Sequence, residues 1–455
     1  MPPNSPTLFR VIAHGSAIVL GSNILLKAIA FLATLLLLRD ISVYDYGLWR
    51  LLLSVLTFVG IFTLPGLDPA IRADLGREAG QGNHSRYRAI FIQFSGLLLS
   101  LAAVVAVGLF IAAPYITVAT GIGVTLYVRI LAVCVFTSAL LRVYSSAFST
   151  HLHFYRAQGI TICSSFFYLV LLIVFLYIYN LGLLGVVMAY ALSSAMSVII
   201  FFLPFVSTVR AELRAASDPS YSLWHSMIRQ HGKWALVSDY SDTTIGSIKP
   251  WLIGYFISIE AVGIFSAAVT LLSALSNILP LSQVLASVLP RQAADREKLL
   301  FFSNRSIKYT LWAYALLALG VLVTAPIAIP LLLPQYAPAI PLLSVLLLSL
   351  ASLAWGDISN TLLNVLRLQK LSFVTNTTAR VLSVACILPL GLMLFGVWGA
   401  VIDQIATSYI ITALRVLYVR RALPAFGPRV RELFTFDIFD RSSLMRIARY
   451  IKPSV

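Results

Sequence analysis

Residues 15–38 read GSAIVLGSNILLKAIAFLATLLLL, an apolar run with a single charge, Lys27. A membrane-spanning helix needs about 20 residues of this kind. Only Arg10 precedes the run as a basic residue, and no small-residue cleavage site follows it before the next apolar run. The run is therefore interpreted as a retained membrane helix and not as a signal peptide.

Composition extends this interpretation to the whole chain of 455 residues, of which 59% are hydrophobic and 11% are charged. Soluble domains average roughly 25% charged residues, so a water-soluble enzyme is excluded. Further apolar runs lie at 46–66, 89–112, 123–145, 159–179, 183–206, 234–257, 262–289, 308–333, 338–360, 371–394 and 397–419. We expect an all-α polytopic membrane protein with about 12 transmembrane helices.

The three cysteines, Cys134, Cys163 and Cys386, all fall inside apolar runs. This placement argues against a disulfide framework and against a metal cluster. The sequence also lacks a Gly-x-x-x-x-Gly-Lys phosphate loop, which argues against ATP hydrolysis. We therefore predict no cofactor, although coupling to H⁺ or Na⁺ stays open.

Basic residues predict the orientation. The net charge is +16, and in the predicted loops every Lys and Arg except Arg39 lies on the side of the N-terminus. Positively charged loops stay in the cytoplasm, so both termini are predicted to be cytoplasmic in a multi-pass protein of the cytoplasmic (inner) membrane. The same asymmetry explains the basic balance without a nucleic-acid partner.

The longest predicted loop divides the chain into two similar halves. We expect a six-helix lobe at 1–206, a cytoplasmic linker at 207–233, a second six-helix lobe at 234–419 and a basic tail at 420–455. Gly47 and Gly263 are 216 positions apart in similar turns between spans, and other matches have nearly the same offset. These matches are Leu64-Pro65 with Leu279-Pro280, Arg156 with Lys370, and the turn 182–185 with the turn 396–399. Six spans per half predict a parallel internal repeat with a substrate path between the lobes.

Several turn motifs resemble those of the polysaccharide and O-antigen flippases of the multidrug/oligosaccharidyl-lipid/polysaccharide exporter superfamily. The motifs are Asp45-Tyr-Gly-Leu-Trp49, Gly66-Leu-Asp-Pro-Ala-Ile-Arg72, Glu260-Ala-Val-Gly-Ile-Phe-Ser266, Gln335-Tyr-Ala-Pro-Ala339 and Gly396-Val-Trp-Gly-Ala400. The resemblance covers nearly the whole chain, and only Phe265, where Tyr is commoner, departs from it.

The resemblance implies a function and leaves rivals. It implies alternating-access export of a polyprenyl-pyrophosphate-linked oligosaccharide, such as an O-antigen, exopolysaccharide or capsule repeat unit, without enzymatic activity. A cation-coupled drug antiporter of the same superfamily is the nearest alternative, but its commonly cationic substrates suit intramembrane Lys and Arg poorly. A glycan polymerase or ligase is a weaker alternative, because the predicted external loops are too short for a catalytic domain.

Charged residues inside spans are candidate functional residues, because each costs at least about 2.5 kcal/mol to insert. Lys27 lies near the middle of the first span, and Lys249 lies in a very polar seventh span with Asp239 and Asp242. Helical periodicity places Asp242 and Lys249 on one face. The two acids are a candidate H⁺ or Na⁺ coupling site. Alternatively they neutralise Lys27 and Lys249, or the span starts near Pro250 and leaves them in a loop.

Arg380 is the third mid-span cation, and its guanidinium suits a pyrophosphate. We predict that Lys27, Lys249 and Arg380 bind the anionic head of the substrate, whereas a structural interpretation pairs Arg380 with Asp403 or Asp357. Arg142 and Asp357 correspond across the repeat and are predicted to gate or anchor.

Other charges are expected near the membrane surface. Arg50, Arg129 and Arg415 lie near predicted span ends and are expected to reach lipid headgroups. The tail from about Val430 to Tyr450 mixes Phe and Leu with Arg, which predicts an amphipathic helix on anionic lipids. That tail is alternatively a docking element for a glycan polymerase or another assembly protein.

Overall fold

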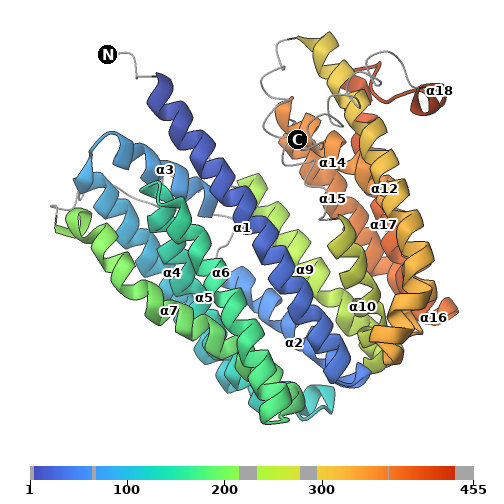
Figure 1. Cartoon of the computed structure of the whole chain (residues 1–455), viewed down its shortest axis with the longest axis horizontal. Helices are drawn as coiled ribbons and strands as arrows, with labels where there is room; N and C mark the ends of the chain where they lie inside the picture. The colour runs from blue at the N-terminus through green and yellow to red at the C-terminus, as the bar shows by residue number, and fades with distance from the viewer. Residues whose placement is uncertain (1–4, 64–67, 215–232, 277–294, 367, 436–455) are drawn as a thin grey trace, which may run out of the picture. The chain divides into compact units, whose positions relative to one another are not determined.

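A computed structural model of the chain describes all residues except 1–4, 64–67, 215–232, 277–294, 367 and 436–455 (Figure 1). The described part is built of helices. They are α1 (Ser5–Asp40), α2 (Val43–Gly60), η1 (Ile61–Thr63), α3 (Asp68–Gly80), α4 (His84–Thr120), α5 (Thr125–Thr150), α6 (Phe154–Ile173), η3 (Val174–Ile178), α7 (Gly182–Arg214), α9 (Lys233–Phe256), α10 (Ile259–Ser276), α12 (Arg296–Leu332), η5 (Pro334–Tyr336), α13 (Ala339–Leu346), α14 (Ser349–Val365), α15 (Gln369–Leu382), η6 (Ser383–Ile387), α16 (Leu388–Phe395), α17 (Val397–Ala422) and α18 (Val430–Phe434). The predicted all-α fold class is confirmed.

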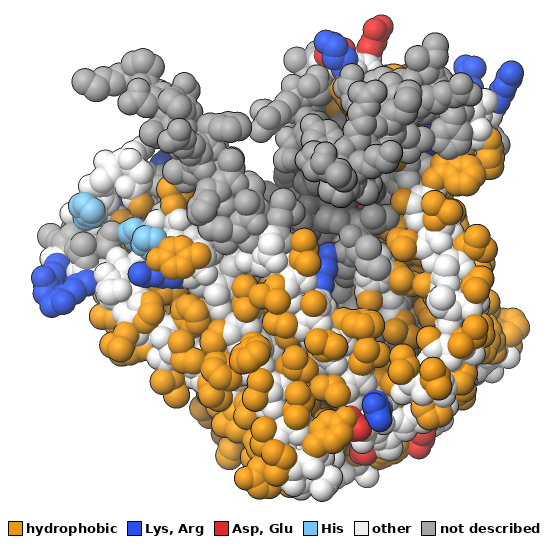
Figure 2. All heavy atoms as spheres, viewed as in Figure 1, with side chains coloured by type: hydrophobic (Ala, Val, Ile, Leu, Met, Phe, Trp, Pro, Cys, Tyr) orange, Lys and Arg blue, Asp and Glu red, His pale blue; other side chains and the backbone are white. Residues whose placement is uncertain are grey.

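Ten of the described helical stretches are long and apolar enough to cross a membrane, and the bent pair α13–α14 makes an eleventh. The pair bends by 41°, and it corresponds to the single span that the sequence predicts at 338–360. Helix α9 is also membrane-length but more polar, because it contains Asp239, Asp242 and Lys249. Figure 2 shows hydrophobic side chains over much of the face in view. Such an exposed apolar surface requires lipid around it.

Two compact units make up the chain. The first contains residues 1–274, 325–343 and 376–403, and the second contains 275–324, 344–375 and 404–455. In the first unit, α4 packs on α5, α5 on α7, α1 on α6, and α2 on α9. In the second unit, a buried cluster of Leu299, Ile307, Ile358, Leu362, Leu363, Val419, Leu423 and Phe426 joins α12, α14 and the end of α17.

Two segments predicted from the sequence, the linker and the tail helix, are only partly covered by the described residues. Helix α7 continues to Arg214, so the first part of the expected linker is helical, and 215–232 lie outside the described residues. Of the expected amphipathic tail helix, the structure describes the short helix α18 and ends its description at Thr435. The rest of that tail stays a prediction.

The internal repeat appears in the first unit as a reciprocal contact between α2 and α10. A Cβ placed on Gly47 would lie 2.0 Å from the carbonyl oxygen of Ile259. A Cβ on Gly263 would lie 2.3 Å from the carbonyl oxygen of Val43. Val43 and Ile259 are 216 positions apart, as Gly47 and Gly263 are. The two contacts are therefore equivalent, which is the two-fold symmetry that the repeat predicts.

The turns before these helices are also equivalent. Ser42 accepts a hydrogen bond from the Asp45 backbone N–H at 3.0 Å, and Ser258 accepts one from the Ala261 N–H at 3.2 Å. Both serines satisfy an N–H group that a helix start leaves without a partner. The repeat thus fixes where the two helices begin, and the glycines fix how closely they approach.

Gln335, from the resemblance motif before α13, closes the same end of the first unit. Its Nε2 donates to the carbonyl oxygens of Leu38 at 2.7 Å and Ile41 at 2.8 Å, at the end of α1. The Tyr336 ring packs edge-on against Tyr46, with centroids 5.9 Å apart. The motif therefore caps α1 and supports the start of α2.

We predict that Gly47→Ala destabilises the protein, because the new methyl group overlaps a backbone carbonyl. Overpacking of this kind costs about 1–3 kcal/mol. The melting temperature of the purified protein in detergent should fall. Gly263→Ala should lower it similarly, because the contact is reciprocal. Gly96→Ala is the matched control, since no atom lies within 4 Å of its new Cβ; equal melting temperatures for all three variants would contradict the close contact.

Candidate functional site

Helix α9 carries the polar residues of the candidate site on a continuous helix. It runs from Lys233 to Phe256 and includes Pro250. The polar residues before Pro250 are therefore helical, and the alternative that leaves them in a loop is wrong. Asp239 lies within α9, but its side chain is outside the described residues. Asp242 and Lys249 are described, and each makes an ion pair with a different helix.

Lys249 pairs with Asp403 of α17. The Lys249 Nζ lies 2.7 Å from Oδ2 of Asp403, whose side chain is 1% exposed. The other carboxylate oxygen, Oδ1, accepts a hydrogen bond from the Ser383 hydroxyl at 2.5 Å. Ser383 is the first residue of η6, a π-helical turn, and such turns occur often at functional sites. Three elements thus converge on one buried carboxylate, both of whose oxygens have partners.

Arg380 pairs with Asp242. Its Nη1 lies 3.1 Å from Oδ1 of Asp242 and donates a hydrogen bond to the Asp242 backbone carbonyl at 3.2 Å. Both side chains are about a third exposed, 32% for Arg380 and 28% for Asp242. This pair is therefore more accessible than the Lys249–Asp403 pair. The two pairs tie α9 to α15 and to α17 within the first unit.

These contacts correct one expectation from the sequence. The structural interpretation pairs Arg380 with Asp403 or Asp357, but Arg380 pairs with Asp242, and Asp403 pairs with Lys249. Lys27 has an exposed side chain on α1. The convergence of Lys27, Lys249 and Arg380 on one substrate head stays a prediction.

Arg142 and Asp357, the predicted gating residues, have different surroundings. The Arg142 Nη1 donates to the Thr63 hydroxyl at 2.8 Å and to the Thr63 carbonyl at 3.2 Å. Arg142 thus fixes the end of η1 against α5. In the second unit, Asp357 experiences the positive charge of Arg415, whose Nη1 donates to the Gly356 carbonyl at 3.1 Å. The geometry supports anchoring by Arg142, and gating by either residue stays a prediction.

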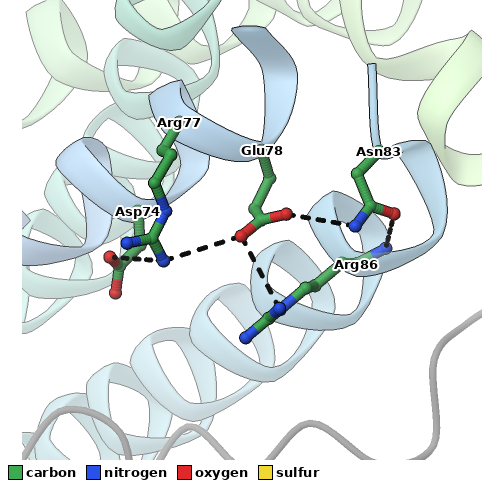
Figure 3. Close-up of polar contacts among 5 residues, drawn as sticks. All are labelled: Asp74, Arg77, Glu78, Asn83 and Arg86. Carbon is green, nitrogen blue, oxygen red and sulfur yellow. Dashed lines mark hydrogen bonds and ion pairs between the residues drawn. The ribbon is translucent and has the colours of Figure 1, made fainter. Parts of the chain in front are cut away.

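A buried acid that the sequence analysis missed, Glu78, joins α3 to α4 (Figure 3). Its side chain is 2% exposed, and its Oε1 lies 3.6 Å from both the Arg77 Nη2 and the Arg86 Nε. Oε2 accepts a hydrogen bond from the Asn83 amide at 3.2 Å. The signal available in the sequence was a group of three acids, Asp68, Asp74 and Glu78, among four arginines between two predicted spans. Through these contacts Glu78 holds the end of α3 against the start of α4.

The fold is similar to the folds of solved membrane transporters. An inward-facing MATE family multidrug resistance transporter of the MOP superfamily aligns with a TM-score of 0.73 and 16% identity, over 88% of this chain and 95% of that one. The lipid II flippase MurJ aligns with a TM-score of 0.67 and 13% identity, over 97% and 94%. The Vibrio cholerae MATE transporter VcmN in its bent form aligns with a TM-score of 0.55 and 16% identity, over 89% and 99%. At these identities the likeness shows the fold, that of a multi-pass membrane protein.

The sequence itself identifies the family. Residues 36–341 match the model of the family described as polysaccharide biosynthesis protein. This match covers more than half of the chain, which therefore belongs to that family. No curated protein matches the chain at the significance required.

We predict that breaking the buried pair is costly. Asp403→Ala leaves Lys249 without its carboxylate, and removal of one partner of a buried ion pair costs about 3–5 kcal/mol. The melting temperature in detergent should fall strongly, and Lys249→Met combined with Asp403→Leu should recover most of the loss. Asp242→Ala is the comparison variant and should lower the melting temperature less, because the Arg380 and Asp242 side chains are 32% and 28% exposed whereas Asp403 is 1% exposed. Equal losses for Asp403→Ala and Asp242→Ala would contradict the buried position of Asp403.

Proposed function

We propose that the protein is a flippase that moves a polyprenyl-pyrophosphate-linked oligosaccharide across the cytoplasmic membrane by alternating access. The family supports a role in polysaccharide biosynthesis, and the fold is shared with a lipid II flippase. The observation that carries the proposal is the pair of cation–carboxylate contacts on α9, Lys249 with Asp403 and Arg380 with Asp242.

The two contacts hold a lysine and an arginine inside the bilayer as ion pairs without net charge. An unpaired Lys or Arg at mid-membrane costs at least about 2.5 kcal/mol, and a carboxylate partner offsets this cost. A pyrophosphate is a stronger anionic partner for a guanidinium, because it offers bidentate acceptors and more charge. We infer that the substrate head displaces Asp242 from Arg380, with Lys249 as the second cation and Lys27 as an approach site on α1.

Displacement of a carboxylate gives a means of coupling. An acid released from its cation in a membrane has a strong tendency to take up a proton or Na⁺. We propose Asp242 as this group, with Asp239 beside it on the helix, and Asp403 as the fixed partner of Lys249. The state of Asp242 then biases which form of the transporter is favoured, because pairing differs between the forms.

Short turns support transport over synthesis. Every second connection between consecutive spans is a short turn that the structure describes in full. These turns lie at 41–42, 121–124, 179–181, 257–258, 333–338 and 396. None has room for a catalytic domain, which disfavours a polymerase or ligase. The drug antiporter alternative has the MATE likeness in its favour, but that likeness concerns the fold. Two intramembrane cations favour an anionic substrate instead.

The proposed orientation rests on the basic residues of the predicted loops. Basic residues dominate the predicted loops on the side of the N-terminus, which supports an inner-membrane protein with both termini in the cytoplasm. The remaining expected partners are membrane lipids and a glycan polymerase or other assembly protein that binds the tail. A nucleic acid and a cofactor have no part in this proposal.

Transport in proteoliposomes tests the function. Translocation of a polyprenyl-pyrophosphate-linked oligosaccharide can be followed by its accessibility to an impermeant lectin. Arg380→Gln should reduce the rate at least about tenfold, because one charge-assisted contact is worth about 1.5–3 kcal/mol. Arg380→Lys should retain part of the rate, and Arg129→Gln, whose guanidinium lies over the Phe110 ring, is the control. Wild-type flux in Arg380→Gln would contradict the proposed head-binding role.

Imposed H⁺ or Na⁺ gradients in the same vesicles test coupling. An Asp242→Asn variant whose flux responds to the gradient as that of the wild type does would exclude Asp242 as the coupling residue.

Impermeant thiol labelling tests the orientation. Gln81 and Gly123 are exposed in the turns at the two ends of α4. In a variant whose native cysteines are replaced, Gln81→Cys should label only from the cytoplasm and Gly123→Cys only from outside. Labelling of both positions from one side of intact cells, or the reverse assignment, would refute the topology.

A further inference from the structure

A cavity of about 230 Å³ lies in the first unit, among α1, α2, α6, α7 and α10. Its walls include Tyr46, Trp49, Tyr168 and Tyr190, and Arg50 is its charged residue. Thr34, Ser165 and Thr270 also line it. Ala30 of α1 lies at its exposed rim. The cavity is smaller than the roughly 300–1,000 Å³ of drug-sized ligand sites, so it has room for one ring-sized group.

The aromatic walls are held in place by one another. The Trp49 and Tyr190 rings lie 5.5 Å apart at 72°, and the Tyr168 and Tyr190 rings lie 5.9 Å apart at 89°. The Tyr46 hydroxyl shares a hydrogen bond with Thr270 at 3.3 Å. Edge-to-face packing is the favourable arrangement for such rings. The rings that line the cavity are therefore already held in place before a ligand enters.

Arg50 differs from Lys249 and Arg380, the two ion-paired cations described above. Lys249 and Arg380 each have a carboxylate partner. The cavity lining contains no Asp or Glu, and among the described residues none pairs with or hydrogen bonds to the Arg50 guanidinium. Arg50 is the eighth residue of α2, and its side chain is only partly exposed. An intramembrane cation without a carboxylate is a strong indication of an anionic ligand.

We propose that this cavity binds a single sugar ring that carries a carboxylate, as one acidic residue of the transported glycan. The inference rests on the proposed function and adds the class of sugar that the protein recognises. One guanidinium matches one carboxylate in charge and in bidentate geometry. The C–H faces of a pyranose pack on the electron-rich faces of aromatic rings, and its hydroxyl groups suit the Ser and Thr hydroxyls.

Two other occupants fit the cavity less well. A pyrophosphate carries more charge than a single arginine neutralises, and it has no apolar face for four aromatic walls. A prenyl or acyl chain suits the aromatic walls but leaves the Arg50 charge desolvated without an anion. Both occupants are distinguishable by their chemistry, so each becomes an outcome of the test.

Binding of methyl β-glucuronide to the purified full-length protein in detergent tests the proposal, with Trp49 fluorescence as the signal. Methyl β-glucuronide should change the fluorescence, and Trp49→Phe should remove that change. Arg50→Gln should weaken binding at least about tenfold, the loss expected for a charge-assisted contact. Arg50→Lys should weaken binding less, and Arg129→Gln should bind as the wild type does. Methyl β-glucoside, which lacks the carboxylate, should bind much more weakly.

Several outcomes would overturn the proposal. No binding of the glucuronide, equal binding of the glucoside, or normal binding by Arg50→Gln would exclude recognition of an acidic sugar. If inorganic pyrophosphate changes the Trp49 fluorescence at lower concentrations than methyl β-glucuronide does, the cavity binds the lipid head. If only a neutral prenyl alcohol changes the fluorescence, the cavity binds the lipid chain. Because this assay measures binding without transport, its failure is separate from a failure of the Arg380 transport assay.

Discussion

A positive charge inside a membrane needs an anionic partner, and this constraint explains the organisation of the first unit around α9. Lys249 satisfies it with Asp403, and Arg380 satisfies it with Asp242. The partners come from helices distant in sequence, so each pair is also a tertiary contact. The polarity of α9, unusual for a span, is a consequence of carrying one partner of each pair. The Ser383 hydroxyl completes the set by satisfying the second oxygen of the most buried carboxylate.

The repeat supplies the framework that holds α9 in place. Helix α2 packs on α9, and the start of α2 meets the start of α10 through Gly47 and Gly263. Because this contact is reciprocal, any movement of one helix start requires an equivalent movement of the other. The same α2 carries Tyr46, Trp49 and Arg50 into the aromatic cavity. One helix thus joins the symmetric contact, the packing of α9 and the proposed sugar site.

The sequence predicts the spans well because an apolar run of about 20 residues has few alternatives in a membrane. It also predicts the repeat, since Gly47 and Gly263 stand in similar sequence motifs and meet in space. It does not predict ion-pair partners. Helical periodicity places Asp242 and Lys249 on one face, but which helix faces them depends on packing, and Arg380 pairs with Asp242 instead of Asp403. Ser383 carries no signal in the sequence, because its role depends on a π-helical turn.

The most direct test of the central claim is the affinity of the protein for polyprenyl pyrophosphate without a glycan. If Asp242 competes with the substrate head for Arg380, Asp242→Asn should bind polyprenyl pyrophosphate more tightly than the wild type, and Arg380→Gln should bind it more weakly. Tighter binding of the pyrophosphate than of the monophosphate should depend on Arg380. Weaker binding by Asp242→Asn, or an unchanged affinity in Arg380→Gln, would contradict the exchange of a carboxylate for the substrate head.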